Sequence, residues 1–189
     1  MDLNGTWRAA VADEGLRRVW QDDDFDPAGW DAVAVPGHWR SHGTFAASDG
    51  PLLYRRSFEA AAPEALRRAW LTFDGLFYQG DVWLDGGYLG DTEGYFAPHT
   101  FEVTDALRAR GEHHLAVEVT CARPADLTAK QNLTGVFQHW DCLDPDWNPG
   151  GIWRPVRLTE TGPVRIAGLR VLCPEANPER AVVVLRATL

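Results

Sequence analysis

The stretch that decides the fold runs from Ala69 to Leu89. It reads AWLTFDG at residues 69–75 and VWLDGGYL at residues 82–89. In both pieces, apolar side chains alternate with more polar or aromatic ones, and a period of two is typical of β-strands that have one buried face. An Asp-Gly pair ends each run, and the pair at residues 85–86 separates two strand-like segments as a two-residue hairpin turn does. The stretch therefore predicts short antiparallel strands joined by tight turns.

The same alternation recurs on both sides of this stretch, around residues 115–119 and 152–158. Helical patterns are short, and Thr104–Arg108 is the best of them, with Thr104 as a candidate N-cap and Gly111 as a stop. Many short strands and few helices favour an all-β antiparallel sandwich. The alternation predicts that the core contains Leu71, Phe73, Val82, Leu84, Leu115, Val117 and Ile152.

Length and composition limit the class of protein. The chain has 189 residues and a net charge of −9, and an acidic surface repels phosphate backbones, so nucleic acid is not an expected partner. No apolar run reaches the length of roughly 18 residues that a membrane span needs, and the N-terminus has no secretory pattern. The odd number of cysteines favours reduced thiols. We therefore expect a cytoplasmic protein with no membrane partner.

A boundary falls near residues 159–163, which read TETGP. Two strand-like runs follow, at residues 164–172 and 181–189. Two strands are a marginal unit by themselves, and an apolar edge of this kind should continue into more sheet. We expect one domain over residues 1–160 and the beginning of a second β-domain, cut inside that domain, over residues 161–189.

Several short motifs together resemble the sugar-binding domain that opens family 2 glycoside hydrolases, the β-galactosidases, β-glucuronidases and β-mannosidases. The resemblance spans about residues 3–160, and the order and spacing of the motifs make it specific. They are LNGTW at 3–7, Trp30 with VPGHW at 35–39, YRRSF at 54–58, LTFDG at 71–75, DVWLDG at 81–86, LGDTEGYFAPHTFEVTDAL at 89–107 and GIWRPV at 151–156.

The resemblance implies a galactose-binding-like jelly-roll sandwich, followed by an immunoglobulin-like β-sandwich and then a (β/α)8 barrel. Residues 161–189 would then be the first strands of the immunoglobulin-like domain. The whole parent protein would hydrolyse O-glycosyl bonds in carbohydrate metabolism. The partners of this chain would be carbohydrate and the downstream barrel of the same parent chain.

The catalytic groups of such an enzyme are not expected in this chain. Retaining glycosidases need two carboxyl groups about 5 Å apart. In the family both are glutamates on the barrel, and the acid/base glutamate follows an asparagine. None of the four asparagines here precedes a glutamate, and no βα repeats follow. We therefore expect no catalytic residue and no hydrolysis by this chain alone.

The strongest candidate for a binding site is the polar and aromatic connection at residues 130–149. Long connections of this kind are often functional. In the family the corresponding loop reaches the barrel's active site, and the position of a sugar-binding carboxylate falls here on Pro145, between two aspartates. The alternative is that the tryptophans pin the loop and the aspartates make turns. The candidate substrate-binding residues are Trp140, Asp141, Asp144, Asp146, Trp147 and Asn148.

Other polar residues are weaker candidates. His38 and His42 have the i, i+4 spacing of a helical metal site, but Pro36 and the nearby glycines oppose a helix, so both are interpreted as loop histidines. His113-His114 is interpreted as an exposed pair, and Asp22-Asp23-Asp24 as a solvated turn rather than a calcium loop. Arg154 could pair with buried carboxylates or with carbonyls. No metal or cofactor is expected.

Three functions remain open from the sequence. The first is a non-catalytic sugar-binding domain that shapes the active-site rim of a family 2 β-glycosidase. The second is an autonomous carbohydrate-binding module, which predicts an exposed aromatic strip on one sheet face. The third is a purely structural interaction domain, which predicts a large exposed apolar patch.

Overall fold

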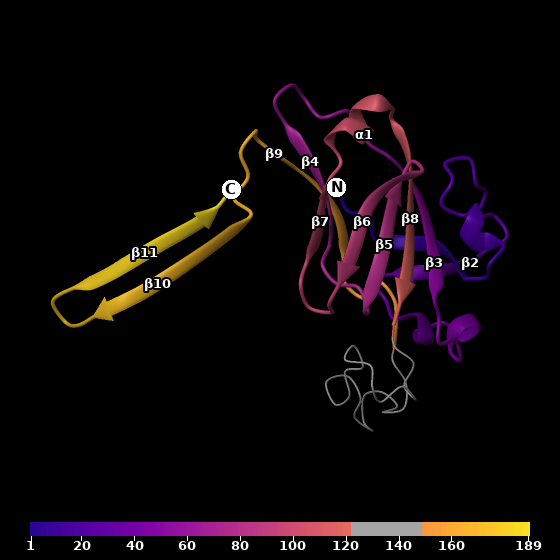
Figure 1. Cartoon of the computed structure of the whole chain (residues 1–189), viewed down its shortest axis with the longest axis horizontal. Helices are drawn as coiled ribbons and strands as arrows, with labels where there is room; N and C mark the ends of the chain where they lie inside the picture. Colours follow the sequence, from indigo (N-terminus) through magenta and orange to yellow (C-terminus); the bar gives the residue numbers. More distant parts are fainter. Residues whose placement is uncertain (122–148) are drawn as a thin grey trace.

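The computed structural model describes residues 1–121 and 149–189 and has two packed antiparallel sheets (Figure 1). The larger sheet has six strands in the order β2-β1-β3-β8-β5-β6. Its strands are β1 (Gly5–Val11), β2 (Asp31–Val35), β3 (Leu52–Glu59), β5 (Gln79–Leu84), β6 (Gly87–Glu93) and β8 (Glu112–Thr120).

The smaller sheet has three strands in the order β7-β4-β9, namely β4 (Arg68–Phe73), β7 (His99–Glu102) and β9 (Val156–Thr161). One short helix, α1 (Thr104–Ala109), follows β7, as the sequence predicts. Thr104 does not cap it, however. Its hydroxyl accepts the Ala69 N–H at 3.0 Å and donates to Glu102 at 2.9 Å, and so ties the helix to β4.

The main core lies between the two sheets. The predicted core residues are confirmed, because all of them belong to one buried apolar cluster. The inner strands contribute alternate side chains to this cluster, as the pleat of a strand requires, whereas β6 and β7 add only the partly buried Leu89 and Phe101. The largest members of the cluster are almost fully buried, namely Trp7, Trp39, Tyr54, Phe73 and Phe77.

The β5–β6 hairpin has the turn that its Asp-Gly sequence predicts. Asp85 and Gly86 have φ angles of 52° and 77°, and Leu84 pairs with Gly87. Two successive positive φ values define a type I′ turn, which matches the twist of a hairpin. A bulge between Val82 and Trp83 shifts the register by one residue, from Val82 opposite Gly90 to Trp83 opposite Tyr88.

A second, smaller core covers the outer face of the larger sheet. The segment after β1, residues 12–30, crosses this face and buries Trp20 against Leu53 and Ala116. Arg55, also on this face, is buried and donates to the carbonyls of Trp20 at 3.1 Å and Phe25 at 3.3 Å. The larger sheet is therefore covered on both faces over part of its width.

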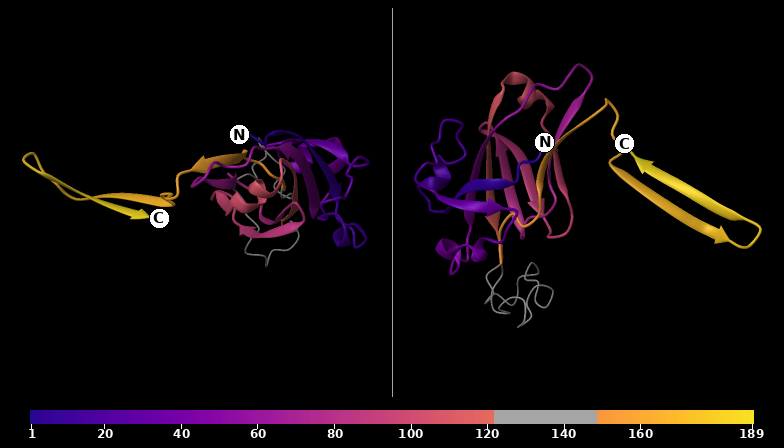
Figure 2. Two further views of the ribbon diagram at one scale, coloured as in Figure 1. Left: turned by 90° about the horizontal axis from the view of Figure 1, so that it is seen from above. Right: turned by 180° about the vertical axis from the view of Figure 1, so that it is seen from behind.

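Two further strands, β10 (Gly168–Ala176) and β11 (Ala181–Thr188), pair only with each other. This hairpin extends away from the two packed sheets in every view (Figures 1 and 2). Its apolar side chains are largely exposed, in contrast to those of β1–β9. No helix in the described parts of the chain is long and apolar enough to cross a membrane.

Candidate functional site

The six predicted substrate-binding residues all lie outside the described residues. Trp140, Asp141, Asp144, Asp146, Trp147 and Asn148 belong to the segment 122–148. What the structure does describe is the end of the sandwich to which this segment is attached. The candidate site is therefore built from the residues that hold the two ends of the segment.

The segment leaves the sandwich at the end of β8. The carbonyl of Thr120, the last residue of β8, accepts the N–H of Tyr78 at 3.0 Å. Cys121 follows and is buried, and its burial raises the pKa of the thiol to about 12. A thiol with so high a pKa stays protonated at neutral pH, so Cys121 is a packing residue and not a nucleophile.

The returning end of the segment is held by two glycines against residues 37–39. Gly150 and Gly151 have positive φ angles of 60° and 103°. A Cβ on Gly150 would lie 2.2–2.4 Å from the indole of Trp39, and one on Gly151 would lie 2.7 Å from the Gly37 carbonyl oxygen. Only glycine fits this approach. The backbone that follows residue 148 is consequently fixed to the sandwich.

Hydrogen bonds secure the same contact. The Gly37 N–H donates to the Ile152 carbonyl at 2.8 Å, and the Phe77 N–H donates to the Gly151 carbonyl at 2.9 Å. The ring Nδ1 of His38 lies 3.0 Å from the Gly150 carbonyl oxygen. Since a carbonyl oxygen only accepts, Nδ1 carries the hydrogen of this bond.

A group of six aromatic rings surrounds this attachment point, and we call it the end cluster: His38, Phe77, Tyr78, Tyr95, Phe96 and Trp153. Each ring of the end cluster packs against at least one other ring of the cluster. His38 stacks on Trp153 at 5.8 Å, and Phe77 meets Tyr95 edge to face at 4.1 Å. Phe96, the outermost ring, is 48% exposed. The end cluster therefore offers a partly exposed aromatic surface beside the predicted loop.

The next feature is the charge state of the groups in and around the end cluster. Burial lowers the pKa of His38, only partly opposed by its hydrogen bond to the Gly150 carbonyl, so the imidazole is neutral at pH 7. The sequence suggested that Arg154 pairs with buried carboxylates or with carbonyls, and among residues 1–121 and 149–189 no buried carboxylate pairs with it. The residue is exposed, and its guanidinium lies over the Trp153 ring at 4.4 Å. At the rim, the Tyr78 hydroxyl donates to the Glu93 carboxylate at 2.6 Å. An aromatic surface bordered by one cation and one carboxylate can accept a sugar face or the surface of another domain.

Most of the end cluster was not identified from the sequence. Tyr78 precedes β5, and Tyr95 and Phe96 follow its hairpin partner β6, so the β5–β6 hairpin brings them together. Trp153 joins them from the segment 149–155, far along the chain. The available signal was the pair of adjacent aromatic residues at 77–78 and again at 95–96.

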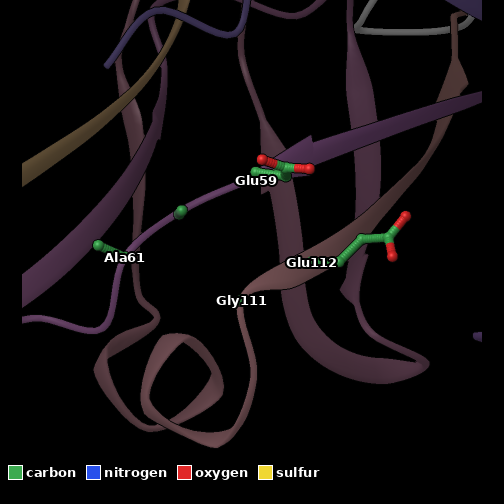
Figure 3. Close-up of a pocket in the computed structure, with 5 residues that line it drawn as sticks. Glu59, Ala61, Gly111 and Glu112 are labelled. Carbon is green, nitrogen blue, oxygen red and sulfur yellow. The ribbon is translucent and has the colours of Figure 1, made fainter.

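A hollow of about 520 Å³ lies at the opposite end of the larger sheet (Figure 3). Glu59 and Glu112, which are register partners on β3 and β8, line it together with small residues, Ala60, Ala61 and Gly111. The Glu112 side chain is 70% exposed. These walls offer no buried acid and no aromatic ring to position a sugar, so the hollow is not a catalytic site.

Two interpretations of charged residues need correction. His113 is not exposed. It faces inward on β8, is fully buried, and its Nδ1 lies 2.7 Å from Asp85. Asp23 is not merely a solvated turn residue either, because it pairs with Arg110 and with His114. The hydrogen bond from Arg110 is the main reason that the pKa of Asp23 lies below its usual value.

The interpretation of His42 as a loop residue is confirmed. His42 caps two single-turn 3₁₀ segments, Trp39–Ser41 and Gly43–Phe45, and its Nε2 accepts the Ala34 N–H at 3.0 Å. Among the described residues, histidine, cysteine and carboxylate side chains form no group of three that could hold a metal ion.

Comparisons with known proteins agree with this architecture. In sequence, the chain is 27% identical over 182 residues to a β-galactosidase of Clostridium acetobutylicum, a match that covers 83% of this chain and 19% of the relative. It is 33% identical over 137 residues to β-mannosidase B of Aspergillus clavatus, covering 61% of this chain and 16% of the relative. The chain thus spans less than a fifth of the length of these curated relatives.

In structure, the chain resembles a β-glucuronidase from an uncultured Clostridium species, with a TM-score of 0.73 and 21% identity over all of this chain and 33% of the other. It also resembles the β-glucuronidase of Bifidobacterium dentium solved with coumarin-3-O-glucuronide, with a TM-score of 0.68, 27% identity, and coverage of 92% and 32%. A sequence model described as "Glycosyl hydrolase 2 galactose-binding domain-like" matches residues 44–154, more than half of the chain. The chain therefore belongs to the galactose-binding-like domain family of glycosyl hydrolase family 2.

Proposed function

We propose that this chain is the non-catalytic N-terminal domain of a family 2 β-glycosidase, and that the segment 122–148 carries its contribution to the active-site rim. The observation that carries the proposal is the fixed attachment of this segment. Gly150 and Gly151 bind its returning end to residues 37–39, beside the end cluster. A rigid support of this kind is what a loop needs in order to place side chains accurately.

Within the segment, Asp144 and Asp146 are the proposed sugar contacts, and Trp140 and Trp147 the proposed stacking residues. A carboxylate can accept hydrogen bonds from two neighbouring sugar hydroxyls, and an indole can cover the apolar face of the ring. Asp141 and Asn148 flank these residues. The end cluster would support the loop from below and contact the catalytic domain with its exposed ring, Phe96.

The C-terminal hairpin fits the same proposal. Residues 161–189 would be the first strands of an immunoglobulin-like domain, and the domain over residues 1–160 would end with β9. On one face of the hairpin, Val171 pairs with Leu185 and Leu169 with Ala187. These side chains are exposed here, and a second sheet of such a domain would cover them. The exposed free thiol of Cys173 fits a reducing cytoplasmic location.

The deciding experiment uses the parent protein encoded by the full gene, assayed against aryl β-galactoside, β-glucuronide and β-mannoside. Asp144→Ala and Asp146→Ala are compared with Asp105→Ala, an exposed aspartate on α1. Loss of one charge-assisted hydrogen bond to a sugar hydroxyl lowers kcat/KM by about 10- to 150-fold. The proposal is wrong if the parent hydrolyses none of these substrates, or if both loop variants retain full activity.

The chain of 189 residues alone is the second arm of this experiment. It should hydrolyse none of the three substrates above background, because the two-carboxylate arrangement of a retaining glycosidase belongs to the barrel. Turnover that disappears on mutating Glu59 or Glu112 would contradict the non-catalytic assignment.

A further inference from the structure

The outer face of the β5–β6 hairpin carries a row of aromatic rings that the proposed function does not use. The indole of Trp83, on β5, meets Trp20 edge to face at 5.1 Å on one side and the Tyr88 ring at 5.2 Å on the other. Trp20 is buried, Trp83 is half-buried and Tyr88 is 55% exposed. The row therefore begins in the second core and ends at the surface.

The Tyr88 ring is held along the sheet rather than pointing away from it. Tyr88 is the register partner of Trp83, yet its hydroxyl donates to Asp81 at 2.7 Å, two residues further along β5. Two residues of a strand span about 6.6 Å. The Tyr88 side chain therefore runs along β5 from the level of Trp83 to Asp81, and it is 55% exposed.

The hydroxyl of Tyr88 stays a donor over the whole physiological range. Its hydrogen bond to Asp81, followed by burial and the nearby charges of Asp81 and Asp91, raises the pKa of Tyr88 to about 12. One carboxylate oxygen of Asp81 is thus occupied by the phenol, and the other remains able to accept further hydrogen bonds.

Carboxylates form a row across three strands beside this ring. Asp81 pairs in register with Asp91 on β6 and with Glu118 on β8. Arg17 pairs with Glu118, which leaves the charges of Asp81 and Asp91 facing each other. Like charges at directly opposed positions destabilise a sheet. Residues that lower the stability of a fold in this way are expected where they serve a function.

We propose that Trp83, Tyr88, Asp81 and Asp91 form a second carbohydrate contact that binds a neutral hexose unit on the outer face of the β5–β6 hairpin. The apolar face of the sugar ring stacks on Tyr88, and its hydroxyls donate to the two carboxylates at the edge of that ring. A uronic acid is excluded by the same carboxylates. None of these four residues belongs to the end cluster, and the existence of the site does not depend on the proposed function.

The ligand class follows from how the acceptors are arranged. The Asp81 carboxylate accepts the phenol hydrogen at the edge of the Tyr88 ring, where the equatorial hydroxyls of a hexose stacked on that ring point. A cation would compete for the same carboxylates, and the cationic probe below tests that alternative. Arg17 neutralises one carboxylate of the acidic row, that of Glu118, and the phenol occupies one oxygen of Asp81. What remains is a flat apolar surface bordered by hydrogen-bond acceptors, which matches a neutral sugar.

The test is a titration of the ¹⁵N-labelled chain, followed by NMR, with three β-linked neutral tetrasaccharides, of glucose, galactose and mannose. Tetragalacturonate and spermine serve as the acidic and cationic probes. We expect at least one neutral hexose tetrasaccharide to bind in the low-millimolar range, with shifts centred on residues 81–91. Tyr88→Ala should weaken that binding by at least about tenfold, whereas Tyr88→Phe keeps most of it.

Leu66→Ala, which removes a side chain that is 77% exposed in the turn between β3 and β4, is the matched control and should bind as the parent sequence does. Thermal unfolding of each variant shows that the fold is intact. The proposal is overturned if no neutral tetrasaccharide shifts these residues at about 10 mM, if spermine or tetragalacturonate binds there more tightly, or if Tyr88→Ala has no effect. The readout is binding by this chain, so hydrolysis by the parent protein does not enter the result.

Discussion

The carboxylate of Asp85 joins the β5–β6 turn to the buried start of β8. Its Oδ2 lies 2.7 Å from Nδ1 of His113, which is fully buried, and its Oδ1 accepts the N–H of His114 at 2.7 Å. Because a carboxylate is an acceptor, Nδ1 of His113 carries the hydrogen. One residue therefore shapes a type I′ turn with its backbone and satisfies two buried donors with its side chain.

Asp85→Ala should destabilise the chain by about 2–4 kcal/mol. The variant leaves the buried Nδ1–H of His113 without its partner and places alanine at a positive φ. Asp85→Asn should cost less, since asparagine tolerates this φ and keeps an acceptor. Urea unfolding at pH 7 measures both. Asp105→Ala, at an exposed position, should leave the unfolding midpoint unchanged. Equal effects of the alanine and asparagine variants would contradict this explanation.

The sequence contained the signal for the burial of His113, although the paired histidines suggested an exposed strand start. The alternation that places Leu115, Val117 and Val119 in the core continues backwards to His113. The burial of His113 was not predicted because histidine is polar, and its buried Nδ1–H needs an acceptor that only the tertiary fold supplies. The strands, the Asp-Gly turn and the core were predictable since they follow from local alternation.

Gly150→Ala should destabilise the chain by about 3 kcal/mol or more. The new Cβ would overlap the Trp39 indole, which is enclosed in the core, at a backbone position with positive φ. Gly43→Ala is the matched control, because a Cβ there meets nothing within 4 Å and Gly43 lies in the same region of the sandwich. Thermal and urea unfolding compare the two. A small loss for Gly150→Ala would mean that the returning end of the segment is not fixed against Trp39.

The stability of the chain should fall as the pH drops below about 6.5, in part because of His38. Burial lowers its pKa in the folded state, so the unfolded chain binds more protons once the pH falls below the unfolded value of about 6.5. His38→Gln keeps a donor for the Gly150 carbonyl and does not titrate. Urea unfolding between pH 5 and pH 8 should show a shallower loss for this variant than for the parent sequence. Parallel pH profiles would contradict the burial argument.

The candidate site was predictable only in part. The loop's aromatic and acidic residues could be selected from the sequence, but the structure does not describe residues 122–148, so their role stays a prediction. Its support could not be predicted. The fit of Gly150 against Trp39 and the contact of Phe96 with Trp153 join residues more than 50 positions apart, and no local pattern encodes such contacts.

The last prediction concerns the hairpin β10–β11. Ending the chain after Gly162 should change Tm by less than about 3 °C, because the hairpin pairs only with itself and its apolar side chains are exposed. The lost contact between the Arg165 guanidinium and the Trp70 ring, at 4.4 Å, is partly exposed and contributes little.

The same truncation should abolish concentration-dependent association of the chain. Exposed apolar strands with unpaired edges associate in water. Sedimentation velocity at several concentrations measures this association, and a double variant provides a control that keeps the hairpin. Val171→Thr with Leu185→Thr replaces one exposed cross-strand pair by residues that favour strands equally well, and it should reduce association without changing Tm. If the truncated chain instead unfolds, the hairpin belongs to the sandwich, and the division of the chain near residue 160 is wrong.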